Sequence, residues 1–103
     1  MSELWTDVLA TRGNRWEART QAGYIELFRL HVQPHFGRAK ASAITARDVR
    51  LWVQTLRARG LALATAARCV SVLSAVMKDA IEKGLRSDNP CAGARPRTPA
   101  PEV

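Results

Sequence analysis

The sequence predicts an all-α fold, a compact bundle of four helices. Apolar side chains recur three and four residues apart along most of the chain, and no stretch alternates between apolar and polar residues over the length of a strand. The 103 residues, 47% of them hydrophobic, are enough to bury one core but too few for two ordinary domains. No apolar run reaches the length of a membrane span, and the N-terminus lacks a signal-peptide pattern, so we expect a cytoplasmic protein.

The first two predicted helices have recognisable ends. The first covers residues 3–12, with Ser2 as its N-cap and Gly13 at its stop. The second begins at Thr20, a residue that caps helices well, or one turn earlier, and ends before Pro34 because proline cannot continue a helix interior.

The third and fourth predicted helices are delimited more sharply. Thr45 and Asp48 have the spacing of a capping box at the start of the third, and Gly60 is placed to end it. The fourth runs over residues 64–83 and ends at Gly84. Apolar spacing predicts these buried side chains on the two helices: Val49, Trp52, Val53, Leu56, Ala66, Val70, Leu73, Met77, Ala80 and Ile81.

The C-terminal end has a different composition. Prolines recur from residue 90 onward, and hardly any apolar side chain larger than that of alanine accompanies them. We therefore expect a folded domain over residues 1–90 and an interdomain linker or disordered tail over residues 91–103.

The charge of the chain indicates a polyanionic partner. Sixteen Lys and Arg residues stand against nine Asp and Glu residues, a net charge of +7, and residues 38–60 hold six of the basic side chains against one acid. Nucleic acid is the first candidate. The alternative is an Arg-rich surface that is merely solvated.

Two helix faces combine basic and small side chains. On the fourth helix an outward stripe would span roughly 15 Å, comparable with the width of a DNA major groove, and the start of the second helix has a similar character. The flexible ammonium groups and the loop cations Arg38, Lys40 and Lys78 are expected on phosphates. The two faces comprise Arg68, Ser71, Ala75 and Lys78 on the fourth helix, and Arg19, Thr20, Ala22 and Gly23 on the second.

Catalytic and metal-binding roles find little support in the residues. Tyr24 lies in line with apolar positions, and no cluster of activating groups around it can be identified, so we expect it in the core. Trp5 and Trp52 are likewise expected in the core, whereas Trp16 could flank DNA. We expect no catalytic residue, no cofactor and no metal site, because the Cys and His residues lack ligand spacing and Pro34 separates the two histidines: Cys69, Cys91, His31 and His35.

The order of short motifs resembles the core-binding, SAM-like domain of tyrosine recombinases, the phage-integrase group, over nearly the whole chain. The pattern departs at Ala64, where relatives often have a polar or prolyl residue. The motifs are Arg19–Thr20, His31–Gly37, Ala43–Val49, Arg59–Leu61 followed by Thr65, Leu73–Ala80 and Gly84–Pro90.

The resemblance implies a role in DNA recombination. In that family a small helical domain holds one side of the recombination site, and a separate C-terminal domain carries the catalytic residues and closes on the other side. It implies that this chain binds double-stranded DNA, has no enzymatic activity alone, and acts with a catalytic domain of the same chain and with other protomers on nucleoid DNA. Carried over by position, the DNA contacts are Arg19, Thr20, Gln21, Thr65, Arg68 and Ser71.

Two other functions remain open at this stage. A helix-turn-helix regulator would use the fourth helix to recognise an operator as a symmetric dimer, whereas the recombinase fragment is expected to be monomeric alone. A helical protein-interaction module would present its arginines to an acidic partner.

Overall fold

The computed structural model describes residues 2–92, and all regular elements in that range are helical, which confirms the predicted all-α class. The predicted tail lies outside the described residues from residue 93 onward. The α-helices are α1 (Ser2–Thr11), α2 (Ala18–Leu27), α3 (Gln33–Phe36), α4 (Ala46–Ala58) and α5 (Leu63–Glu82). Three short turns join them: the 3-10 turns η1 (Gly13–Arg15) and η3 (Ala41–Ala43), and the π-helical η2 (Phe28–Val32).

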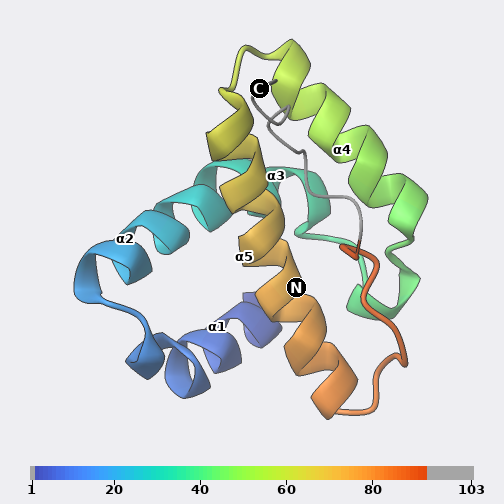
Figure 1. Cartoon of the computed structure of the whole chain (residues 1–103). Helices are drawn as coiled ribbons and strands as arrows, with labels where there is room; N and C mark the ends of the chain where they lie inside the picture. The colour runs from blue at the N-terminus through green and yellow to red at the C-terminus, as the bar shows by residue number, and fades with distance from the viewer. Residues whose placement is uncertain (1, 93–103) are drawn as a thin grey trace, which may run out of the picture.

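Helix α5 is the centre of the fold. Figure 1 shows it crossing the molecule with α1 and α2 on one side and α4 on the other. Because neighbours cover both flanks, burial extends beyond the predicted stripe to Val72 and Val76, while Ile81 is only half-buried. Helix α5 therefore packs against elements on both of its sides and fixes their positions relative to one another.

Aromatic side chains fill the core on both sides of α5. The predictions for Trp52 and Trp5 are confirmed, since they are only 1% and 6% exposed. The Trp52 indole Nε1 donates a hydrogen bond of 3.2 Å to the carbonyl of His31, and Trp5 stacks on Phe28 with ring centroids 4.7 Å apart. The indole donor of Trp52 is thus satisfied in the core.

The second predicted helix takes the earlier of its two predicted starts and differs from the prediction at its end. It begins at Ala18 with Glu17 as its N-cap. Thr20 therefore lies in its first turn, and the prediction that Thr20 caps the helix was wrong. The prediction that Pro34 ends it was wrong, because the π turn η2 widens the helix and leaves Pro34 in the first turn of α3, where its missing N–H is tolerated.

The predicted capping box at the start of α4 and the predicted glycines after α4 and α5 are confirmed. The capping box is complete, with Asp48 N–H donating to Thr45 Oγ1 over 3.1 Å and Thr45 N–H donating to the Asp48 carboxylate over 3.0 Å. These hydrogen bonds lower the pKa of Asp48. Gly60 and Gly84 have φ of 93° and 76°, the left-handed conformation that glycine adopts most easily after a helix.

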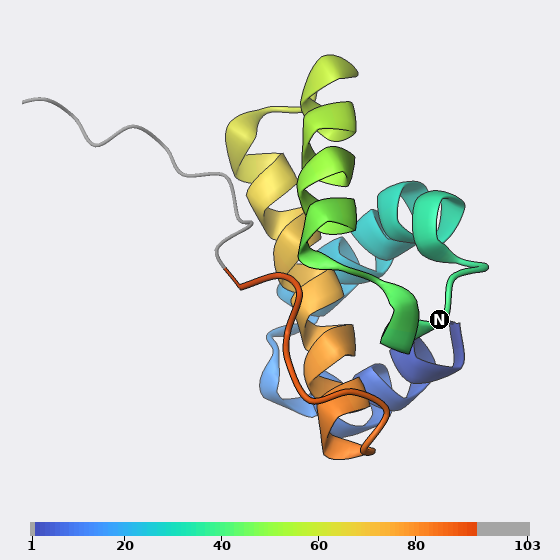
Figure 2. The same ribbon diagram turned by 90° about the vertical axis from the view of Figure 1, so that its right-hand side faces the viewer.

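The segment after α5 folds back along that helix, as Figure 2 shows. The Arg86 guanidinium donates hydrogen bonds to the carbonyls of Ala41 and Ile44, at 2.8 and 2.7 Å, and so ties this segment to η3. Further on, Asn89 Nδ2 donates to Ser74 Oγ of α5 over 3.0 Å, and Cys91 is buried in the core. The chain therefore leaves the described domain beside the middle of α5.

Candidate nucleic-acid interface

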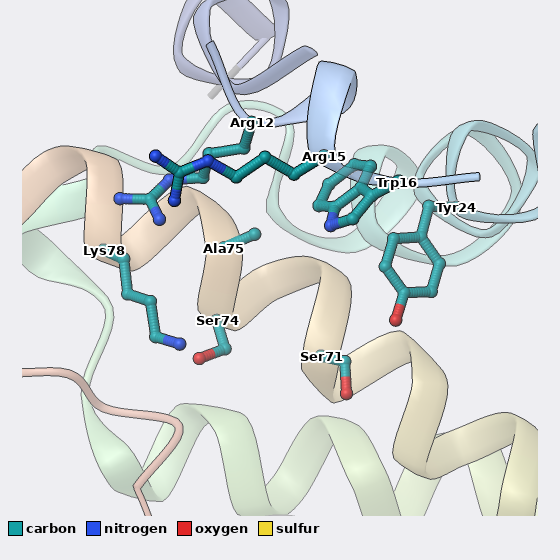
Figure 3. Close-up of a pocket in the computed structure, with 8 residues that line it drawn as sticks. All are labelled: Arg12, Arg15, Trp16, Tyr24, Ser71, Ser74, Ala75 and Lys78. Atoms are coloured by element: carbon teal, nitrogen blue, oxygen red, sulfur yellow. The ribbon is translucent and has the colours of Figure 1, made fainter. Parts of the chain in front are cut away.

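A groove of about 290 Å³ lies between the segment that joins α1 to α2, helix α2 itself and the middle of α5 (Figure 3). Its walls come from three parts of the sequence that only the tertiary fold brings together. The lining side chains are basic, hydroxyl-bearing, aromatic or small: Arg12, Arg15, Trp16, Tyr24, Ser71, Ser74, Ala75 and Lys78.

The groove carries an excess of positive charge. Arg12 is neutralised by Glu82, whose carboxylate lies 2.6 Å from its guanidinium. Arg15 and Lys78 are both exposed and form no ion pair with another described residue. No acidic side chain lines the groove within the described part of the chain, so the two unpaired cations face solvent and attract an anion.

One wall of the groove is aromatic. Tyr24 meets Trp16 edge to face, with centroids 4.9 Å apart, and Trp16 in turn contacts Trp5 of the core at 6.3 Å. Tyr24 is half-buried, because its ring packs on Trp16 while it also lines the groove. The predicted core position of Tyr24 is therefore correct for its ring, and its hydroxyl end reaches the site.

The floor of the groove is formed by α5. Ser71 donates a hydrogen bond of 3.2 Å to the carbonyl of Ala67 one turn earlier, and Ser74 accepts one from Asn89. Ala75 adds only a methyl group. A ligand can therefore approach the backbone of α5 closely at this point.

The structure brings only part of the predicted set together. Ser71 and Lys78 line the groove, and Arg68 is exposed one turn before Ser71 on α5, with Thr65 a further turn along. Because residues three apart lie on the same side of a helix, this row extends the groove towards the start of α5. Arg68, Ser71 and Lys78 thus lie on one face of α5, whereas Thr65 is turned further around the helix.

The patch on the second helix lies beside the groove without lining it. Thr20 precedes Tyr24 by one turn, and Arg19 is exposed next to it. The Gln21 side chain instead turns back onto η1, where its Nε2 lies 2.8 Å from the point that a Cβ on Gly13 would occupy. Glycine at position 13 makes room for this contact, so Gln21 is engaged within the fold.

Gly23 has no packing partner. A Cβ added there would meet nothing within 4 Å, so close packing of a neighbouring helix does not require glycine at this position. The surface of α2 is therefore open at this position.

The two loop cations lie elsewhere. Arg38 and Lys40 are both exposed in the turn between α3 and η3. Lys40 lines a second hollow, together with Asp7 and Lys83, that shares no lining residue with the groove. The structure therefore does not group these two cations with the others.

Several groove residues escaped the prediction from sequence. Arg12 was placed as the last residue of the first predicted helix and Arg15 in the turn after it, and neither was assigned to a binding face. Ser74 was omitted although it lies three residues after Ser71. Aromatic residues at helical spacing usually indicate a core, so nothing in the sequence marked the hydroxyl of Tyr24. The spacing of Ser71, Ser74 and Lys78 was the one signal that could have identified the floor.

Other reactive side chains lie away from the groove. His31 and His35 fall on one helical run, contrary to the expectation that Pro34 separates them, and both border a small hollow beside Trp52. Residues 2–92 contain no group of three or more His, Cys, Asp or Glu side chains placed to hold a metal ion.

Burial raises the pKa of the Cys69 thiol to about 11.

An all-helical domain with a basic groove has the features of a DNA-binding module. The family described as the phage integrase central domain matches residues 2–97, and the chain belongs to this family. That membership assigns it the general DNA-binding role of tyrosine recombinases and integrases. Comparison with curated proteins and with solved structures gives no match. Among the described helices, none combines the length and apolarity needed to cross a membrane.

Proposed function

We propose that this domain binds duplex DNA at the core site of a tyrosine recombinase through the face formed by the groove and the first half of α5. The observation that carries the proposal is the groove itself, in which Arg15 and Lys78 are unpaired with described residues and no described acid lines the wall. Arg68 continues this face along α5, Thr65 lies in the first turn of the same helix, and Arg19 is exposed on α2. Such a surface favours a polyanion over an apolar protein segment.

The domain is expected to act as one half of a clamp. A catalytic domain of the same chain would supply the strand cleavage and rejoining and close on the opposite side of the duplex, and further protomers would occupy the same DNA. The hydrogen bond from Asn89 to Ser74 supports this arrangement, because the chain leaves the domain beside the groove. The place of action would be the cytoplasm, on nucleoid DNA.

The proposal is tested by titrating this chain into fluorescent duplex DNA at several salt concentrations. A half-clamp should bind with a dissociation constant of about 10⁻⁴ to 10⁻⁶ M, and the affinity should fall steeply between about 50 and 200 mM salt. Failure to bind duplex DNA at low salt would contradict the proposed function. A monomer by sedimentation is expected, whereas a stable dimer would favour the helix-turn-helix alternative.

Arg68→Ala locates the interface on α5. Its side chain is exposed and forms no hydrogen bond or ion pair with another described residue, so the variant should keep its helicity and unfolding temperature while the affinity for duplex DNA falls by about tenfold. Arg50→Ala is the matched control, because Arg50 is an exposed cation on α4 and does not line the groove. Equal losses in both variants would mean that only net charge matters.

A further inference from the structure

Two neutral donors face the groove without a partner. Figure 3 shows the Tyr24 hydroxyl and the Trp16 indole nitrogen both directed towards α5. Neither group forms a hydrogen bond with another described residue. On the floor, Ser74 Oγ accepts from Asn89, which leaves the serine's own hydroxyl hydrogen available to donate.

The fold holds these donors in place. Tyr24 packs edge to face on Trp16, Trp16 rests against Trp5, and Trp5 stacks on Phe28 with an interplanar angle of 7°. Trp5 and Phe28 are buried, so this chain of rings connects the groove to the core. Positioned donors of this kind lose little conformational freedom when a ligand arrives.

The chemistry of the lining fits an anion with many acceptor atoms. Arg15 and Lys78 add positive charge beside the neutral donors, and within the described residues the lining contains no carboxylate. The edges of bases present both donors and acceptors, whereas the oxygens of a phosphodiester accept only. The groove therefore matches the DNA backbone better than a base edge.

Stacking of an unpaired base is less compatible with the same residues. The Trp16 ring already contacts Trp5 and the edge-to-face ring of Tyr24, with centroid separations of 6.3 and 4.9 Å. A base-stacking platform needs an open ring face.

We propose that the groove is a phosphodiester site, in which the Tyr24 hydroxyl and the Trp16 indole donate to phosphate oxygens while Arg15 and Lys78 supply the charge. The inference rests on the proposed function and deepens it. Contacts of this kind fix the register of the domain on the duplex and carry no base identity. Tyr24 is then a DNA-positioning residue and has no role as a nucleophile.

The test compares Tyr24→Phe with the unchanged chain in titrations of several duplexes of unrelated sequence. The substitution removes one hydroxyl and keeps the ring that packs on Trp16, so thermal unfolding should be unchanged. Loss of one hydrogen bond should weaken binding by about fivefold on every duplex. Since no charge is removed, the dependence of affinity on salt should keep its slope.

Three further variants complete the experiment. Lys78→Ala should weaken binding and reduce the salt slope by about one. Trp16→Phe, which removes the indole N–H, should weaken binding with the slope unchanged. Thr55→Val removes a hydroxyl of α4 that donates within its own helix, and it should bind like the unchanged chain.

Several outcomes would overturn the inference while leaving DNA binding itself intact. Undiminished affinity in Tyr24→Phe would show that the hydroxyl makes no contact. A loss confined to some duplex sequences would indicate base recognition, and tighter binding of single strands than of duplexes would indicate stacking. If the unchanged chain failed to bind any duplex, the proposed function would fall as well.

Discussion

The groove between α2 and α5 and the outer side of α4 are both basic, yet they differ in what surrounds their cations. Residues 38–60, which include α4, hold most of the net charge of the chain. One of the hollows beside α4 is nevertheless lined largely by apolar side chains such as Leu51 and by the carboxylate of Asp48. The groove has fewer cations, but they face a concave surface with hydrogen-bond donors and without a described acid.

This difference shows that charge density along a sequence does not by itself locate a binding surface. Helix α4 buries Trp52 and Leu56 against the core, and an amphipathic helix needs a polar outer face whether or not that face binds anything. One of its arginines, Arg57, donates to the carbonyl of Leu61 over 2.7 Å and helps to close the turn after the helix. The groove instead places charge where a ligand can be enclosed.

The largest expected effect concerns Trp52, the buried side chain that packs α4 against the core. Trp52→Ala should lower the free energy of unfolding by about 3–5 kcal/mol, because it empties a fully buried site between α4 and its neighbours. Chemical denaturation followed by circular dichroism measures this. A loss below about 1 kcal/mol would mean that α4 is not anchored through this side chain.

Arg86→Ala distinguishes a structural arginine from those of either basic region. The side chain is only 9% exposed and satisfies two carbonyls of the η3 segment. Its removal should cost about 2 kcal/mol of unfolding free energy, while DNA affinity per folded molecule stays unchanged. A selective loss of DNA binding without loss of stability would place Arg86 in the interface instead.

A carboxylate introduced into each region compares them directly. Ala75→Glu puts a negative charge on the floor of the groove, and Gln54→Glu makes the same change in net charge on the exposed side of α4. We expect affinity for duplex DNA to fall at least about tenfold in the first and less than about twofold in the second. Similar losses would remove the distinction between the two faces.

Thr45→Ala should have the smallest effect. Loss of the N-cap of α4 should lower stability by about 1 kcal/mol without altering DNA affinity. Because the hydrogen bonds of the capping box lower the pKa of Asp48, the contribution of this carboxylate is present at neutral pH and is lost as the pH falls through that lowered value. The difference between variant and parent should therefore shrink in acid, as urea unfolding at several pH values would show.

Much of the fold was predictable because its signals are local. The capping box of Thr45 and Asp48 and the glycines at positions 60 and 84 depend on residues within one or two turns, and all were found correctly. The error at Pro34 had a different origin. A π turn over Phe28–Val32 changes the register of the helix before the proline. The residue propensities of this segment do not predict such a turn.

The candidate site was predicted only in part. Ser71, Arg68 and Lys78 could be assigned to one outward face because helical periodicity orders residues along a single element. Arg15, Trp16 and Tyr24 join them only through packing of α2 and η1 against α5. Lys40, expected with the phosphate contacts, lies in a different hollow because the turn after α3 carries it away.

The sequence by itself determined the all-helical class, the capping box and glycine stops of α4 and α5, and most of the side chains that face the core, since these follow from residue spacing and short-range hydrogen bonds. Only the tertiary structure decided which cations share a surface. That depends on how helices distant in the chain cross one another, as the aromatic contacts from Trp5 to Tyr24 illustrate. The physical reason is that a groove belongs to the space between elements, and no single element encodes it.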